Sequence, residues 1–167
     1  MKKLLLLAVI AIGVWWYRSA GHKLSEDDVN NFYRDYQVAT LQRKPGDLCA
    51  LLADDFQSAA VMAAGREVRA DAQDKEQTCA AWRDLYDSWD KLGEKMGGIL
   101  QLDSHYTIHH IAISSDRKSA TVDVSSSLDV AGSLMNMRSR STDTLVRRNG
   151  KVMLQRSEGR VSIDGGT

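Results

Sequence analysis

A single acidic residue, Asp143, falls where the sequence pattern predicts a position inside the protein. Residues 135–147 alternate between apolar and polar side chains, as a strand with one buried face does. Asp143 is in phase with the apolar Met137 and Leu145, and with two serines, Ser139 and Ser141. Burial raises the pKa of a carboxyl group and suits it to act as a general base. The alternative, which we favour, is a structural carboxylate or one in a salt bridge, since Arg147 and Arg148 are close in the sequence.

Two cysteines, Cys49 and Cys79, are the only thiols of the chain. In an oxidising compartment an even pair is consistent with one disulfide. Each also lies on an apolar stripe of a predicted helix, where a free cysteine packs as a small apolar residue. The sequence leaves these two interpretations open, but it disfavours a catalytic thiol because neither cysteine has a histidine or a basic cluster beside it.

Three histidines close together, His105, His109 and His110, suggest metal binding. On a strand, His105 and His109 would stand about 13 Å apart, and His109 and His110 would point to opposite faces. Zinc ligands lie only about 2 Å from the metal, so neither pair closes a site by itself. We therefore expect strand histidines with no metal, and no other cofactor.

A row of arginines occupies the other phase of the same predicted sheet. Its members are Arg138, Arg140, Arg148, Arg156 and Arg160. Guanidinium groups bind carboxylates and phosphates, so such a row is a candidate surface for a second copy of the chain or an acidic envelope protein. The alternative is a solvated sheet face, where arginine is common, but the concentration of these residues in two adjacent strands leads us to favour a partner-facing surface.

Helices are predicted before residue 97. Ser25 and Asp28 form a capping pattern ahead of a helix that ends at Pro45-Gly46, and Asp47 begins a second, short helix whose apolar stripe runs to Phe56. Residues 57–72 are ambiguous between a short strand and irregular structure. Residues 74–96 form the strongest helix, with one apolar stripe: Cys79, Trp82, Tyr86, Trp89, Leu92 and Met96.

Strands are predicted after Gly97-Gly98. Residues 106–113, 120–130, 135–147 and 152–163 alternate with period two, and Asn149-Gly150 is a strong hairpin turn. Helices followed by an antiparallel meander are typical of an α+β domain.

The N-terminal residues have the pattern of a membrane or export segment. Lys2 and Lys3 precede an apolar run over residues 4–17 that ends in aromatic residues, which favour the membrane interface. The run is short for a span, but no small-residue cleavage site follows it. We predict an uncleaved anchor in residues 1–23 and a domain over 24–167 facing the periplasm from the inner membrane, with secretion to the periplasm after cleavage as the alternative. The domain has more acidic than basic residues, which disfavours nucleic-acid binding.

The stretch over residues 48–56, LCALLADDF, resembles the second helix of nuclear transport factor 2-like domains, and the strands after Gly98 fit the cone-shaped sheet of that superfamily. The resemblance implies helices packed on a curved antiparallel sheet. It also implies that the outer sheet face can form a dimer and that enzymes of this group hold their base inside the cone.

Two functions follow as hypotheses. The first is a non-catalytic, membrane-tethered binding or assembly module of the bacterial envelope. The second is an enzyme or carrier of the SnoaL-like or ketosteroid-isomerase-like kind, with a ligand in the cone. A cone filled by Trp82, Trp89 and Met137 would favour the first, whereas an apolar cavity beside one buried ionisable residue would favour the second.

Overall fold

The computed structural model describes residues 23–63, 67–69, 72–98, 100–132 and 135–165. The predicted membrane segment over residues 4–17 lies outside these ranges and remains a prediction. Within them, no helix combines the length and apolarity needed to cross a membrane.

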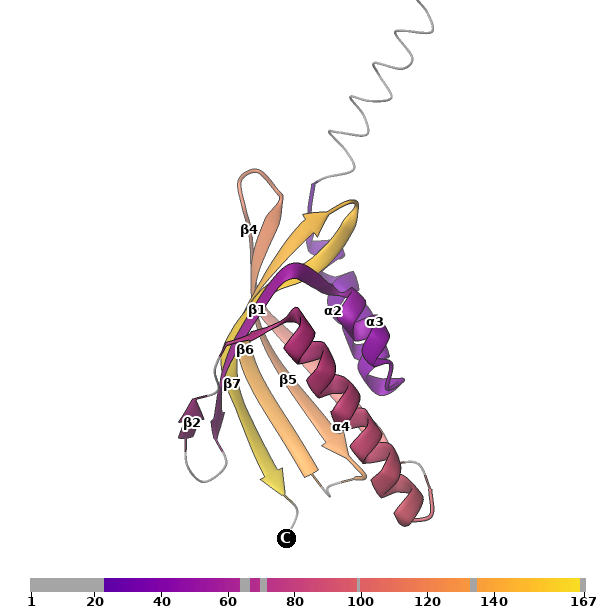
Figure 1. Ribbon diagram of the computed structural model, residues 1–167. Helices are drawn as coiled ribbons and strands as arrows, with labels where there is room; N and C mark the ends of the chain where they lie inside the picture. Colours follow the sequence, from indigo (N-terminus) through magenta and orange to yellow (C-terminus); the bar gives the residue numbers. More distant parts are fainter. Residues whose placement is uncertain (1–22, 64–66, 70–71, 99, 133–134, 166–167) are drawn as a thin grey trace, which may run out of the picture.

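Three helices pack on a single curved sheet, which confirms the α+β prediction (Figure 1). They are α2 (Glu26–Leu41), α3 (Pro45–Ala50) and α4 (Lys75–Lys95). Ser25 caps α2 through the predicted capping box with Asp28, and Asp74 caps α4 in the same way through Gln77. In both boxes, side chains satisfy amide groups that the first helical turn leaves without partners.

The sheet joins seven strands of the described residues in the order β2-β1-β7-β6-β5-β4, with β3 beside β1. The strands are β1 (Leu52–Ala63), β2 (Glu67–Arg69), β3 (Gln73–Asp74), β4 (Leu102–Ile113), β5 (Ser119–Val130), β6 (Met135–Arg148) and β7 (Lys151–Gly165). The four predicted strands appear as the antiparallel meander β4 to β7. Asn149 and Gly150 both have positive φ, as a two-residue hairpin turn requires.

Strand β1 corrects the prediction for residues 47–72. The second helix begins at Pro45 rather than at Asp47 and ends at Ala50, so Leu52 and Phe56 are strand residues. The ambiguous segment instead begins within a 12-residue strand that runs parallel to β7. Parallel pairing with the last strand is a contact between distant parts of the chain, and no local sequence pattern reports it.

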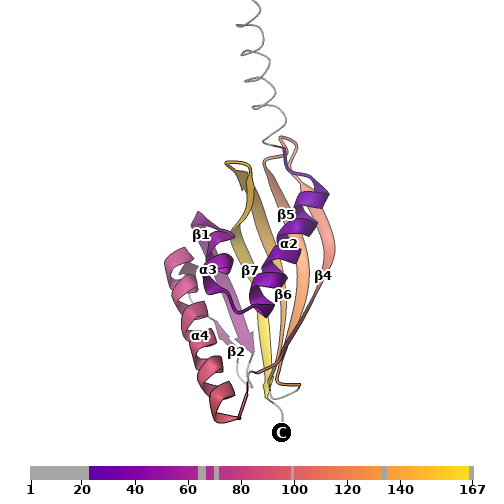
Figure 2. The ribbon, with the colours of Figure 1, turned by 90° about the vertical axis from the view of Figure 1, so that its right-hand side faces the viewer.

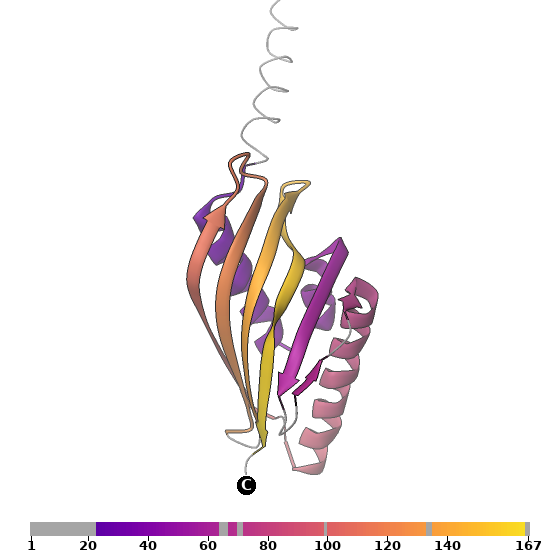
Figure 3. The ribbon, with the colours of Figure 1, turned by 90° about the vertical axis from the view of Figure 1, so that its left-hand side faces the viewer.

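The helices cover one face of the sheet and leave the other uncovered. Figure 2 shows α2 and α3 crossing the concave side beside α4, whereas Figure 3 shows the opposite face with the strands in front. Phe32 and Tyr33 of α2 are buried against the sheet with Val122 and Leu145. The core therefore lies between the helices and the concave face.

The apolar stripe of α4 reaches the core only in part. Cys79, Tyr86 and Trp89 are buried as predicted, but Leu92 is 39% exposed and Met96 58% exposed. Leu92 lies in the last turn of α4 and Met96 is its C-cap, so the C-terminal end of the helix is less buried than its periodicity predicts.

Candidate functional site

Asp143 is buried on the concave face of β6, in the inward phase that the sequence predicts. The Tyr33 hydroxyl donates to Asp143 Oδ2 at 2.8 Å, and the Ser157 hydroxyl donates to Oδ1 at 2.7 Å. Burial raises the pKa of Asp143, whereas the hydroxyl groups of Ser157, Tyr33 and Ser141 act in the opposite direction because they favour the ionised carboxylate.

The neighbouring arginines bind other carboxylates. The Arg147 guanidinium lies 2.8 Å from Asp28 Oδ2, and Arg148 binds both carboxylate oxygens of Asp55 at 2.7 Å. Among the described residues, no lysine, arginine or histidine forms an ion pair with Asp143. Of the two forms of the favoured interpretation, the described residues thus show no salt bridge to Asp143 but a carboxylate held by hydroxyl groups.

A cavity of about 300 Å³ lies between α2, α4 and the sheet. Aromatic side chains form most of its apolar wall, among them Tyr36, Trp82, Tyr86, Trp89 and Tyr106. Trp82 and Trp89, with Met137 of β6, thus border an open space and do not fill the cone. This volume is at the lower end of the range for small-molecule sites.

A second cavity of about 170 Å³ adjoins the first and reaches Asp143. Tyr36, Ser126, Ser139 and Val161 line both spaces. The floor of the second consists largely of small residues on neighbouring strands: Ser58, Ala60, Ser126, Ser139, Ser141, Ser157 and Gly159. Inward positions of a sheet usually carry large apolar side chains, so this run of small residues leaves the space beside Asp143 empty.

Gly159 sets the spacing of β6 and β7 at this floor. A Cβ atom at Gly159 would lie 2.5 Å from the Arg140 carbonyl oxygen and 2.8 Å from the Ser141 Cβ atom. Both contacts are too short for a side chain, so glycine permits the close approach of the two strands beside Asp143.

Tyr36 lies where the two cavities meet. Its ring packs edge-on against Trp82, with centroids 6.1 Å apart. Burial raises its pKa, with smaller contributions from Tyr86 and Asp143, so the hydroxyl keeps its proton at neutral pH. No hydrogen bond joins this hydroxyl to another described residue, which leaves a donor for a bound molecule.

Tyr33 and Tyr36 were not among the site residues predicted from the sequence. A buried tyrosine needs a partner for its hydroxyl, and that requirement was the signal pointing from Tyr33 to a polar residue of the sheet.

Cys49 and Cys79 form a disulfide between α3 and α4, with Cα atoms 5.6 Å apart. The bond holds the N-terminal half of α4 beside α3. It thereby helps to fix Trp82, one turn further along α4, as a wall of the larger cavity.

Four of the five predicted arginines lie on the convex face, which no helix covers in Figure 3. Arg138 and Arg140 are exposed on β6, and Arg156 and Arg160 are exposed on β7. We call these four residues the arginine face. Arg140 lies directly opposite Arg160 in the β6–β7 register.

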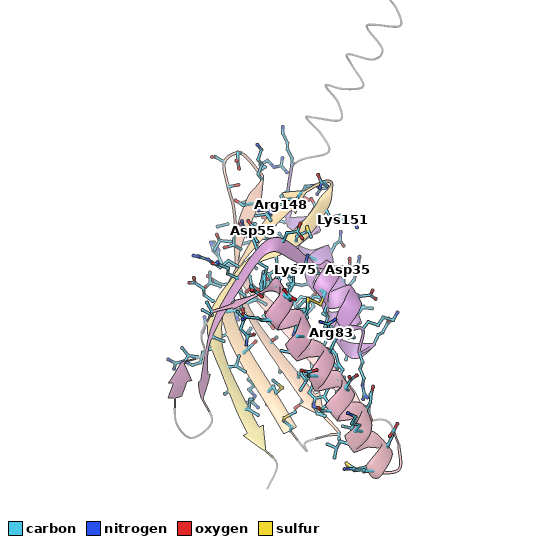
Figure 4. All side chains as sticks on the ribbon, viewed as in Figure 1. Asp35, Asp55, Lys75, Arg83, Arg148 and Lys151 are labelled. Atoms are coloured by element: carbon cyan, nitrogen blue, oxygen red, sulfur yellow. A yellow bond between two sulfur atoms is a disulfide. The ribbon has the colours of Figure 1, made fainter. Side chains whose placement is uncertain are left out.

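Arg148 lies apart from the arginine face, at the end of β6. Figure 4 shows it close to Asp55, with Lys75 below. Its guanidinium and the Gln155 amide lower the pKa of Asp55 to about 2. Lys75 binds Asp54 at 2.9 Å in the same region. These ion pairs connect the start of β1 to β6 and α4.

The histidines lie on the outer side of β4. A β-bulge between Ile108 and His110 leaves both His109 and His110 exposed, which corrects the prediction that they point to opposite faces. His109 Nε2 lies 2.8 Å from the Ser125 hydroxyl, and His105 lies 3.2 Å from Asp103. The described residues contain no group of three or more ligands that could hold a metal ion.

Comparison with solved structures identifies the architecture. A nuclear transport factor 2-like protein of unknown function from Shewanella oneidensis superposes with a TM-score of 0.61, at 12% identity over 81% of this chain and 98% of that chain. The domain has the nuclear transport factor 2-like fold. A protein from Novosphingobium aromaticivorans, provisionally described as a scytalone dehydratase, gives a TM-score of 0.57 at 15% identity over 85% of this chain and 87% of that chain.

LinA gives a TM-score of 0.59 at 11% identity, over 85% of this chain and 89% of that chain. At such identities the nuclear transport factor 2-like likeness extends to the fold alone. No protein-family model matches the sequence. No curated protein matches it either.

Proposed function

We propose that this chain is a membrane-tethered domain of the bacterial envelope that binds a small, largely apolar molecule inside its cone. The observation that carries the proposal is the buried Asp143 beside an aromatic cavity. An apolar pocket with a few convergent polar groups is the usual form of a ligand site. The free Tyr36 hydroxyl and the Asp143 carboxylate supply those polar groups here.

The small residues on the floor of the smaller cavity support the same proposal. A domain that needed only a core would gain stability from larger inward side chains, since empty space costs about 24 cal/mol per Å³. Serines at positions 126, 139, 141 and 157 forgo that gain and keep a polar cavity beside Asp143.

The disulfide supports a location outside the cytoplasm. Disulfides persist in oxidising compartments such as the periplasm and are rare in reducing ones. This agrees with the proposed tether at residues 4–17. A reporter that is active only in the periplasm, fused after Thr167, should give signal, and intact protein in the cytoplasmic fraction would reject the topology.

A second candidate function is acid–base catalysis on the bound molecule. Burial raises the pKa of Asp143 toward the range in which a carboxylate accepts a proton efficiently near neutral pH. Tyr36 would then donate a hydrogen bond to the oxygen on which charge develops.

Filling the cavity tests the binding function. Ser139 lines both cavities, so Ser139→Leu should exclude ligand while keeping the fold. We expect wild type to bind the neutral probe 2-(2-naphthyl)ethanol in calorimetry, and Ser139→Leu to lose that binding with an unchanged circular dichroism spectrum.

The matched control is Ser162→Leu, which adds the same volume on the outward position opposite Arg138. It should bind the probe like wild type. Equal binding by Ser139→Leu and wild type would show that the probe occupies some other place and would reject the proposal.

A further inference from the structure

We infer that the molecule held in the cone is an amphipathic organic cation, with its ammonium head against Asp143 and its apolar body against the aromatic wall. This inference rests on the proposed ligand-binding function and names its ligand class. Four features of the described residues lead to it.

The first feature is the kind of group that surrounds Asp143. Tyr33 and Ser157 direct hydroxyl donors at the carboxylate, and Ser141 also favours its ionised form. Burial acts against these groups and raises the pKa of Asp143, because no described residue forms an ion pair with the carboxylate. A cation bound beside Asp143 would stabilise the ionised form that burial disfavours.

The second feature is where the nearby basic residues point. Arg138 borders the larger cavity, and Arg140 and Arg160 border the smaller one. All three are exposed and occupy outward positions of β6 and β7, so strand alternation directs their guanidinium groups to the convex face, while Asp143 points to the concave one. A cation inside the cone would supply the countercharge that these arginines do not.

The third feature is the aromatic wall. Tyr36, Trp82, Tyr86, Trp89 and Tyr106 line the larger cavity. The faces of these rings carry negative potential, which attracts a cation within about 6 Å and disfavours an anion. An anionic ligand would be disfavoured both by the faces of these rings and by the Asp143 carboxylate.

The fourth feature is the division of the space. The smaller cavity holds Asp143 and the serines, the larger one holds the tryptophans, and Tyr36 borders both. A charged head and an apolar body are thus accommodated in adjoining places, which a compact polar cation would not use.

Three probes that differ only in the head group test the inference on the full chain in phosphatidylcholine nanodiscs at neutral pH. They are 2-(2-naphthyl)ethylamine, 2-(2-naphthyl)ethanol and 2-naphthylacetic acid. By calorimetry we expect the amine to bind at least about tenfold more tightly than the alcohol, and the acid to bind most weakly. An alcohol or acid that binds as tightly as the amine would overturn the inference.

Asp143→Asn keeps the shape of the side chain and removes its charge. We expect it to weaken amine binding at least about tenfold and to weaken alcohol binding by a smaller factor, because only the amine loses a charge pair. The control Asp123→Asn removes a carboxylate from the outer sheet face, where Asp123 binds Thr142, and should change neither. Unchanged amine binding by a folded Asp143→Asn protein would also overturn the inference.

The head-group comparison in wild type decides the matter even if Asp143→Asn fails to fold. It also separates the two proposals. If the alcohol binds in the cone and the amine binds no better, the cation inference fails and the binding function stands. If none of the three probes binds, both fail.

Discussion

The Tyr33 hydroxyl lies 2.8 Å from Asp143 Oδ2, so one hydrogen bond joins α2 to β6 across 110 residues of sequence. The ring of Tyr33 stacks on Tyr106 of β4, with centroids 5.7 Å apart. The same residue therefore fixes α2 over the sheet and satisfies one oxygen of the buried carboxylate.

Removing this hydroxyl should destabilise the fold. Tyr33→Phe leaves a buried carboxylate with one donor fewer, and we expect a loss of about 1–3 kcal/mol in the free energy of unfolding, measured in urea. The control is Tyr36→Phe on the same helix. Its hydroxyl has no hydrogen-bond partner among the described residues, so its loss should cost less than about 0.5 kcal/mol. Equal effects of the two variants would contradict the role assigned to Tyr33.

The stability contribution of Asp143 should depend on pH with a defined sign. Its folded-state pKa lies above the ordinary value of 3.8, so the folded protein binds this proton more tightly than the unfolded chain does. The contribution is therefore present below about pH 3.8 and is lost as pH rises through the raised pKa.

Asparagine does not titrate, so the stability of wild type minus that of Asp143→Asn should fall as pH rises above about 4. Urea unfolding of both proteins across this range measures the difference. Asp55, whose pKa is lowered to about 2, has the opposite pH dependence but is present in both proteins and cancels. A difference that stays constant or grows with pH would contradict the predicted sign.

Trp89 should contribute strongly to stability. It is 5% exposed and packs edge-on against Tyr86, with ring centroids 5.5 Å apart. Trp89→Ala should cost about 3–5 kcal/mol, as truncations of core aromatics do. Leu92→Ala, one turn further along α4 and 39% exposed, should cost well under half of that. Comparable melting temperatures of the two variants would place Trp89 at the surface.

The arginine face should contribute little to folding. Arg138, Arg140 and Arg156 are exposed, and exposed charges typically change stability by about 0–1 kcal/mol. The variant with serine at all three positions should therefore have a melting temperature close to that of wild type.

We propose that the arginine face binds an acidic partner or a second copy of the chain. Self-association at low salt should therefore be weaker in the triple serine variant than in wild type, and added salt should weaken the self-association of wild type. Identical sedimentation of both proteins across a salt series would show that the arginine face is solvated surface that takes no part in association.

The sequence predicted the helices and strands whose patterns are local. The Ser25 capping box, the long helix and the Asn149-Gly150 hairpin each follow from a few adjacent residues, and the structure has all three. The parallel pairing of β1 with β7 depends on residues about 100 positions apart, such as Gln57 and Arg156. Local alternation cannot report such a contact, which is why residues 52–56 were assigned to a helix and the residues after them were left open between a short strand and irregular structure.

Of the candidate site, the sequence predicted only which face of β6 carries Asp143. Alternation along β6 correctly directed Asp143 inward, but its donors come from α2 and β7. The bulge beside His110 reversed the expected facing of one histidine, because an extra residue shifts the alternation. The cavity itself depends on small inward residues of four strands, and each of them looks like an ordinary polar strand position when its strand is considered alone.

The attachment of residue 24 has a consequence for how ligand is supplied. The Leu24 amide donates to the Arg117 carbonyl oxygen at 2.7 Å, which holds the start of the domain at the β4–β5 turn. Leu128, in the wall of the larger cavity, lies about 30 Å further along β5 at roughly 3.3 Å per residue. If residues 4–17 anchor the chain in a bilayer as proposed, this length of strand would separate the cavity from the point of attachment. A molecule bound in the cavity would then be taken from the dissolved pool of the surrounding compartment, and the fraction of sites occupied would follow its concentration in water rather than the composition of the membrane.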